Sequence, residues 1–88
     1  MKIKPEYTVR FYEDDICIVR LRPDGEEDYI CQISETAAMA WEGIEHGIER
    51  DELINAIVTE FSGASNETVA ADLDALMSQL VALGYAEA

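Results

Sequence analysis

The feature that most constrains this chain is a tight turn, the five residues Arg22-Pro23-Asp24-Gly25-Glu26. Proline presets the backbone of the first central position, aspartate suits the second, and glycine takes the positive φ that follows. This order of residues predicts a hairpin with a three-residue loop and a bulge at Gly25. Because the loop length of a hairpin sets its register, the turn also predicts which residues oppose each other across the two strands.

The predicted register pairs opposite charges on one face of the hairpin and gathers apolar residues on the other. Arg22 opposes Glu26 and Arg20 opposes Asp28, which are two favourable cross-strand pairs. The apolar face is expected to be the core side. Its members are Cys17, Val19, Leu21, Tyr29, Cys31 and Ile33, with Cys17 directly opposite Cys31.

A further strand precedes the hairpin. From Tyr7 to Tyr12, residues alternate between two faces with the period of a half-buried strand. We therefore expect three antiparallel strands at about residues 7–12, 16–22 and 26–33. In a simple meander the third strand lies at an edge, and it is expected to point the backbone groups of Tyr29, Cys31 and Ile33 outward. Such an edge is either covered or used to bind an added strand.

The rest of the chain has helical periodicity. Ser34 is a good N-cap, Ser65 or Asn66 caps a later helix, and Gly84 stands where a helix-ending glycine belongs. Helices are expected at about residues 35–46, 50–61 and 66–83, with a loop at 62–65. Their apolar stripes are expected to form the core: Ala37, Trp41, Ile44, Ile48, Leu53, Ile54, Ile57, Val58, Phe61, Val69, Leu73, Leu76, Met77, Leu80 and Leu83. The 88 residues thus predict a single α+β domain, a three-stranded antiparallel sheet followed by three helices.

The net charge of −13 argues against one class of partner. Residues 23–88 hold fifteen acids and one base, Arg50, so most of the chain lacks the basic face that phosphate contacts require. Such a charge repels polyanions and attracts cationic partners. Alternatively, the acids are solvated helix faces that keep a small protein soluble. We expect no nucleic-acid partner.

Neither a membrane segment nor an export signal is evident in the sequence. The longest apolar stretches are a few residues long, and the chain does not begin with the apolar region of a secretory signal. The expected location is the cytoplasm, with no membrane partner and with Cys17 and Cys31 as reduced thiols. A reversible disulfide between the two is the alternative, because the register places them opposite each other.

Residues suited to catalysis are scarce. His46 is the only histidine and stands at an expected helix end, which is a surface position. The cysteines lack metal-ligand spacing, and the sequence contains neither a calcium-loop pattern nor a glycine-rich phosphate loop. We therefore expect no catalytic residues, no metal and no cofactor, in a protein that is not an enzyme.

Several segments resemble the PqqD family, coenzyme PQQ synthesis protein D. Residues 33–41 are similar to the family's segment L-N-x-T-A-x-x-I-W, with Ser34 in place of the asparagine and Ala40 in place of the branched residue. Residues 53–61 resemble the family's second helix, and residues 69–85 its motif V-x-x-D-V-x-x-F-L-x-x-L-x-x-x-G-L/W. The similarity covers nearly the whole chain.

The resemblance implies a winged-helix-like peptide-binding module, a RiPP recognition element, which captures the leader of a ribosomally made precursor peptide. In this family the leader adds as a strand beside the third strand, in a groove floored by the third helix. The module presents the peptide to a modifying enzyme, which in the PQQ pathway is a radical SAM protein. Carried onto this chain, the binding residues are Tyr29, Ile30, Cys31, Gln32 and Ile33 on the strand and Val69, Asp72, Leu73, Leu76 and Leu80 on the helix.

Two other functions remain open for a chain of this kind. A winged-helix DNA binder has a similar outline, but residues 66–88 contain no lysine or arginine to contact phosphates. An acidic adaptor or regulator of the same fold would bind a partner protein and no precursor peptide. Because an open strand edge allows two chains to pair, the protein is expected to be a monomer or a homodimer.

Overall fold

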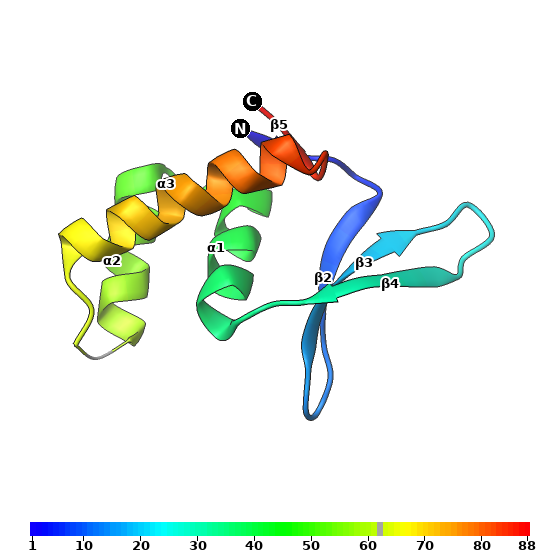
Figure 1. The fold of residues 1–88 in the computed structure, drawn as a ribbon, viewed down its shortest axis with the longest axis horizontal. Coiled ribbons are helices and arrows are strands. Elements are labelled where there is room, and N and C mark those ends of the chain that lie inside the picture. Colours follow the sequence, from blue (N-terminus) through cyan, green and yellow to red (C-terminus); the bar gives the residue numbers. More distant parts are fainter. Residues whose placement is uncertain (62) are drawn as a thin grey trace.

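The structure, a computed structural model, describes residues 1–61 and 63–88. It confirms the three-stranded antiparallel sheet followed by three helices, and each of these six elements lies within one residue of its expected bounds. Figure 1 shows the helices gathered on one side of the molecule, with α1 nearest to the sheet. Ser62, the first residue of the expected loop, lies outside the described residues. The elements are β1 (Lys2–Ile3), β2 (Tyr7–Phe11), β3 (Ile16–Leu21), β4 (Glu27–Gln32), α1 (Glu35–Glu45), α2 (Arg50–Glu60), α3 (Asn66–Ala82) and β5 (Ala86–Glu87).

The turn that joins β3 to β4 has the predicted form. Gly25 has a φ of +88°, a conformation that suits glycine because it has no Cβ. Its N–H donates to the carbonyl of Arg22 at 3.0 Å, and the N–H of Arg22 donates to the carbonyl of Glu26 at 2.9 Å. Next to this turn the register is as predicted, with Arg20 opposite Asp28.

A β-bulge changes the register farther from the turn. Val19 opposes Tyr29 as predicted, but Ile18 opposes Cys31, so Ile30 is an extra residue in β4. An insertion of one residue moves every following side chain of the strand to the opposite face. The turn therefore determined the register only as far as the bulge.

The prediction that Cys17 and Cys31 oppose each other is wrong for this reason. Cys17 opposes Gln32, which places Cys17 and Cys31 on different faces of the sheet. Both are free thiols. Cys17 is fully buried, and this burial raises the pKa of its thiol.

The helices cover the face of β3 opposite to the one predicted. Val9 and Ile18, which oppose each other in the sheet, pack in one cluster with Trp41 of α1 and Leu80 of α3. The charged pairs of the hairpin lie near its tip, which projects away from the helices (Figure 1), so they do not mark the solvent face along the whole strand. Cys31 and Ile33 do pack against the helix-side cluster, because the bulge turns them toward it.

Long side chains close the outer face of the sheet. Cys17 and Val19 point away from the helices, yet their exposed fractions are only 0% and 2%. On the same face, Arg10 opposes Cys17 in the neighbouring strand, and its Nε donates to Glu27 of β4 at 2.9 Å. This bond crosses β3, and it lowers the pKa of the Glu27 carboxyl.

Two short strands that the sequence patterns did not predict join the ends of the chain. Ile3 of β1 opposes Ala86 of β5, and both are buried. The N–H of Lys4 donates to the carbonyl of Tyr85 at 2.9 Å, and the Tyr85 ring lies edge-on to Tyr7 with centroids 5.0 Å apart. Both termini therefore lie side by side (Figure 1).

The predicted helix ends are confirmed. The hydroxyl of Ser34 accepts the N–H of Ala37 at 3.1 Å at the start of α1, and that of Ser65 accepts the N–H of Thr68 at 3.2 Å at the start of α3. Gly84 follows α3 with a φ of +86°. These caps set the positions at which α1 and α3 begin, which matters because the two helices line the site described below.

A second cluster lies between the helices and confirms most of the predicted apolar stripes. Ala37, also a predicted member, is only half-buried and belongs to neither cluster. Two other predicted members are exposed, since Ile48 is 40% exposed and Leu83 is 58% exposed. Both stand just beyond the end of a helix, where the chain turns away from the stripe. The buried members of the cluster are Ala40, Leu53, Ile54, Ile57, Val69 and Leu73.

Gly43 allows α1 and α2 to approach closely. A Cβ at this position would lie 2.5 Å from Cδ1 of Leu53, which is too short for any side chain to be added without a shift. Leu53 is itself buried in the interhelical cluster, so its methyl groups would have to shift within packed surroundings. The glycine is therefore retained inside a helix although it lowers helix propensity.

We expect Gly43→Ala to lower the free energy of unfolding by about 1 kcal/mol, because overpacking outweighs the roughly 1 kcal/mol that alanine adds in helix propensity. In a Leu53→Ala background the same change is expected to raise that free energy by about 0.5–1 kcal/mol, since the opposing methyl groups are gone. Urea unfolding of the four proteins measures both effects. Equal effects in the two backgrounds would contradict the close-approach explanation.

Candidate functional site

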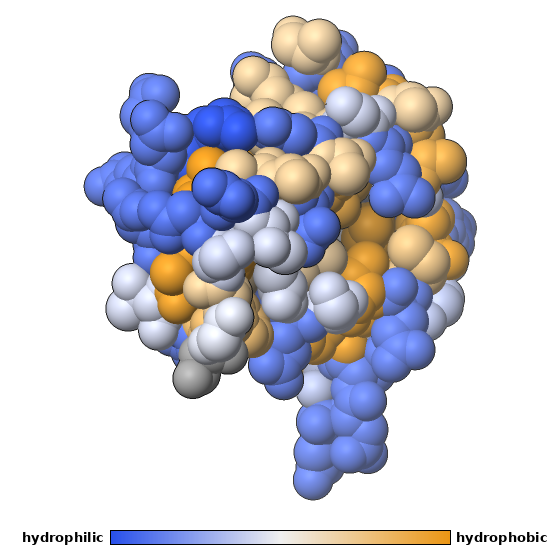
Figure 2. All heavy atoms as spheres, turned by 60° about the vertical axis from the view of Figure 1, so that its left-hand side comes forward, coloured by the Kyte–Doolittle hydropathy of each residue, from blue (hydrophilic) through white to orange (hydrophobic). Residues whose placement is uncertain are grey.

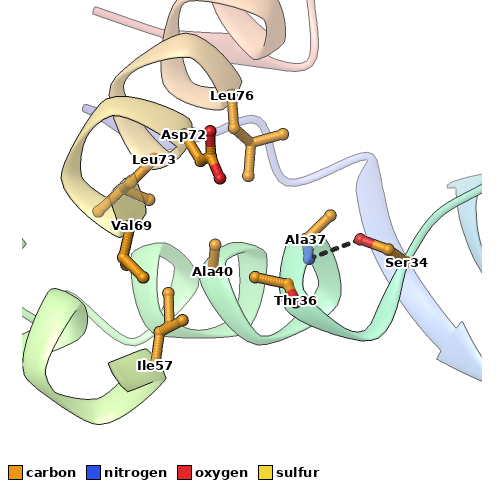
Figure 3. A pocket seen from close by; sticks show the side chains of 9 residues that line it. All are labelled: Ser34, Thr36, Ala37, Ala40, Ile57, Val69, Asp72, Leu73 and Leu76. Atoms are coloured by element: carbon orange, nitrogen blue, oxygen red, sulfur yellow. Dashed lines mark hydrogen bonds between the residues drawn. The ribbon is translucent and has the colours of Figure 1, made fainter. Parts of the chain in front are cut away.

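A pocket of about 280 Å³ opens between α1 and α3. The facing helices contribute residues of different size: α1 presents small side chains, whereas α3 presents branched ones and a carboxylate. Figure 3 shows these side chains facing each other across the open space. The lining residues are Ser34, Thr36, Ala37, Ala40, Ile57, Val69, Asp72, Leu73 and Leu76.

Small residues at the beginning of α1 explain why the space exists. Ala37 and Ala40 reach only one carbon from the backbone, so Val69 and Leu76 of α3 do not meet them closely enough to fill the gap. The N–H of Ala37 already donates to the Ser34 hydroxyl, so one of the free donors of this helix start is satisfied. The pocket is thus mainly apolar, and Figure 2 shows apolar residues exposed among hydrophilic ones on one face of the molecule.

The open edge of the sheet leads into this pocket. β4 pairs with β3 alone, and the described residues place no strand on its other side. Ser34, which lines the pocket, follows Gln32 at the end of β4 by two residues. The unpaired edge of β4 therefore ends next to the pocket along the chain.

The bulge changes which backbone groups point outward from that edge. The N–H of Ile33 donates to the carbonyl of Ile16 at 2.8 Å, so Ile33 bonds to the sheet. In an antiparallel ladder the outward and inward residues alternate, which assigns Cys31 to the sheet side and Gln32 to the outside. The expectation that the backbone groups of Cys31 and Ile33 point outward from the sheet is therefore wrong. For Tyr29, which precedes the bulge, the outward direction is retained.

The ten residues carried over from the family divide into four groups. Val69, Asp72, Leu73 and Leu76 line the pocket, whereas Leu80 is buried in the cluster around Trp41. Three residues are exposed on the strand, where Tyr29 and Ile30 have exposed fractions of 60% and 37% and Gln32 is also exposed. Cys31 and Ile33 are half-buried against the core.

The helix that opposes α3 was missing from the predicted site. Ser34, Thr36, Ala37 and Ala40 line the pocket, as does Ile57 of α2. The strand-to-helix segment at residues 33–41 contains most of them, and its small residues at Ala37 and Ala40 were a signal that a partner could approach there. Ile57 gave no such signal, because its place in an apolar stripe predicts only core packing.

Asp72 is the one ionisable side chain among the lining residues. The arginines of the chain are engaged elsewhere, since Arg10, Arg20, Arg22 and Arg50 each form an ion pair with an acid. The pocket therefore combines an apolar interior with a negative charge.

An ion pair holds α3 against α2 beside this site. Nε and the terminal nitrogen of Arg50 donate to the two carboxylate oxygens of Asp74 at 2.9 and 2.8 Å. This bidentate geometry lowers the pKa of the Asp74 carboxyl. Neither Arg50 nor Asp74 lines the pocket, and Asp74 points to the side of α3 away from Asp72 because the two are about 200° apart on the helix.

Other kinds of site find no support in the described part of the chain. Residues 1–61 and 63–88 contain no group of three histidine, cysteine, aspartate or glutamate side chains arranged to hold a metal ion. Over the same residues, no helix is both long and apolar enough to cross a membrane.

Comparisons with known proteins agree with this architecture. The family model of coenzyme PQQ synthesis protein D (PqqD) matches residues 17–86, and no curated protein matches the sequence. A solved structure of TbiB1 in complex with the TbiA(beta) leader peptide is similar, with a TM-score of 0.75 and 22% identity over 99% of this chain and 95% of that one. Lasso peptide synthetase B1 complexed with the leader peptide also has a TM-score of 0.75, with 21% identity over 98% and 95% of the two chains. At these identities the structures share the fold.

The Arg50–Asp74 pair predicts a contribution to acid stability. Because the pKa of Asp74 is lowered in the folded state, the pair stabilises the fold above the ordinary carboxyl pKa of 3.8, and this stabilisation is lost as the pH falls through the lowered value. Asp74→Asn is therefore expected to be less stable than wild type at pH 6. Below about pH 4, its free energy of unfolding should fall less than that of wild type. Denaturant unfolding between pH 6 and pH 2 measures this.

Asp14→Asn provides the matched control, because Asp14 is exposed and forms no ion pair in the described structure. This variant should follow the wild-type pH dependence. Identical curves for Asp74→Asn and wild type would show that the pair contributes nothing to stability.

Proposed function

We propose that this chain, which belongs to the PqqD family, binds the leader segment of a ribosomally made precursor peptide and presents it to a modifying enzyme. The observation that carries the proposal is the unpaired edge of β4, which ends two residues before Ser34 of the α1–α3 pocket. The two similar solved structures support it, since their names describe complexes with leader peptides. PQQ synthesis or another RiPP pathway would supply the precursor.

The peptide adds as a strand beside β4. The backbone groups of Tyr29 and Gln32 point outward from β4. Because of the bulge they are three residues apart and not two, so the hydrogen bonds to the peptide are interrupted near Ile30. Beyond the interruption the peptide pairs with Gln32 and continues past Ser34 into the pocket. Main-chain bonds provide affinity for many sequences, whereas alternate peptide side chains that enter the pocket provide selectivity.

The pocket selects an apolar anchor residue. Ala37 and Ala40 leave room for a bulky side chain, and Leu73 and Leu76 contact it from α3. Burial of such a side chain contributes about 1.5–3 kcal/mol. Asp72 favours a lysine or arginine next to the anchor, because its carboxylate has no positive side chain of this protein among the lining residues.

The role of the protein is positional, and its own residues carry out no bond chemistry. A bound leader holds the core of the precursor at an effective concentration of about millimolar near the enzyme, provided that the linker is of suitable length. In PQQ synthesis that enzyme would be of the radical SAM type.

An amide-shift titration of the labelled 88-residue protein tests the proposal. The probes are synthetic peptides that span the first halves of the small precursor-like reading frames next to its gene. We expect saturable shifts at Tyr29, Gln32, Thr36 and Asp72, with a Kd of about micromolar or below. Proline substituted at successive peptide positions should weaken binding at every second position, because strand addition uses alternate peptide N–H groups. Absence of shifts at a large peptide excess would favour an acidic adaptor that binds no precursor.

Filling the pocket is expected to weaken peptide binding without unfolding the protein. Ala37→Leu places three additional carbon atoms in the open space, so we expect at least a tenfold higher Kd, roughly the loss of one buried anchor. Ala75→Leu is the matched control, because Ala75 is an exposed residue of α3 that does not line the pocket. The control should bind the peptide as wild type does. Equal affinities for both variants would place the peptide elsewhere.

A further inference from the structure

A second groove lies along a different side of α1. Its apolar floor comes from three parts of the chain: Phe11 and Ile16 of the β2–β3 hairpin, Met39 of α1, and Phe61 after α2. Its volume is about 330 Å³. We call it the outer groove. It shares no lining residue with the α1–α3 pocket.

Helix geometry separates the two sites. Glu35, Met39 and Glu42 are spaced by four and three residues, so they form one stripe along α1. Ala37 and Ala40 belong to a stripe that points toward α3 (Figure 3). The angle between the two stripes is about 160° at 100° per residue. A protein bound in the outer groove therefore leaves the peptide pocket open.

The outer groove has an acidic rim. Glu35, Glu42 and Glu60 line it together with the apolar floor, and no lysine or arginine does. None of the three takes part in an ion pair of the described structure. The nearest base in the sequence, Arg10, is bonded to Glu27. The groove therefore complements a positively charged ligand.

An aromatic side chain stands uncovered at the same place. Phe11 is 55% exposed although it is one of only two phenylalanines of the chain. The other, Phe61, is half-buried at the opposite wall. Exposed aromatic residues within a polar rim are typical of protein interfaces, where they act as central anchors.

We propose that the outer groove binds a segment of the modifying enzyme in which lysine or arginine residues flank one bulky apolar side chain. The identity of this partner rests on the function proposed above, whereas the chemistry of the segment follows from the groove itself. A second copy of this chain is a poor occupant, because each copy carries a net charge of −13 and its four arginines are already paired. Leader peptide and enzyme then bind to different sides of α1 at the same time.

The probe for this proposal is a synthetic 14-residue amphipathic helix with a Leu-Phe stripe flanked by lysines, compared with the same peptide in which glutamates replace the lysines. Titrated into the labelled 88-residue protein, the lysine peptide is expected to shift the amides of Phe11, Ile16, Met39 and Phe61 and to saturate. The glutamate peptide should cause no shifts there. Phe11→Ala should raise the Kd of the lysine peptide about fivefold or more, and the exposure of Phe11 means that the fold tolerates the change.

Charge variants distinguish the outer groove from general attraction to an acidic protein. The triple variant Glu35→Gln, Glu42→Gln and Glu60→Gln should weaken the lysine peptide about tenfold at low salt. The control triple variant Glu6→Gln, Glu52→Gln and Glu87→Gln has the same net charge and changes exposed acids outside the groove, so it should weaken binding less than about twofold. Equal losses in the two variants, or shifts spread over all acidic residues, would overturn the proposal.

A titration with the leader peptide distinguishes failure of the outer-groove proposal from failure of the proposed leader-binding function. The candidate leader is titrated into protein already saturated with the lysine peptide, and its Kd should be unchanged. Competition between the two peptides would overturn the two-sided arrangement. A lysine peptide that binds the outer groove while no leader binds would support the groove and count against the leader-binding function alone.

Discussion

The burial of Trp41 is the interaction on which the rest of the structure depends. Its side chain is 1% exposed and lies where the sheet, the helices and the paired termini meet, in contact with the cluster of Val9, Ile18 and Leu80. Loss of a buried aromatic side chain costs about 3–5 kcal/mol, a large part of the 5–15 kcal/mol that keeps a small domain folded. Because α1 carries Trp41 inward, the other sides of this helix are left to form the pocket and the outer groove. The two surfaces are thus consequences of one anchoring contact.

The bulge in β4 connects the core to the strand edge. By inserting Ile30, it directs Cys31 and Ile33 toward the helices while the strand near the turn keeps its register. The same insertion interrupts the outward row of backbone donors and acceptors. A regular edge invites pairing with any extended chain, whereas an interrupted edge accepts only a partner that bridges the irregularity. In the proposed binding mode the bulge therefore serves both core packing and selectivity for the added strand.

Local chemistry explains which parts of the structure the sequence predicted. Turn residues, caps and helical stripes act over a few positions, so the hairpin loop at Gly25, the caps at Ser34 and Ser65 and all six main elements were predictable. The bulge was not, because no local pattern marks Ile30 as an extra residue, and it places Cys31 and Ile33 on the face opposite to Tyr29. The face of β3 that the helices cover was also not predictable, because the charged pairs mark the solvent face only near the hairpin tip. The pairing of β1 with β5 was not predictable from the sequence either, since strands of two residues show no periodicity. For the site, the family motif predicted four α3 residues of the pocket, but not the facing residues of α1 or Ile57 of α2.

The charge distribution affects the rate at which basic partners associate more than it affects their binding affinity. The four arginines are held in ion pairs on the sheet and between α2 and α3, so the acids of α1 have no compensating base nearby in the sequence. Each exposed charge of this kind contributes only a modest amount to affinity, although several together add up at low salt, and all of them raise association rates for basic partners. Apolar contacts in the pocket and at Phe11 must then provide most of the binding free energy. In the proposed arrangement the leader pocket shares side chains such as Val69 and Leu73 with the interhelical core, so peptide binding and core packing depend on the same residues. Phe11 of the outer groove is exposed and belongs to neither core cluster.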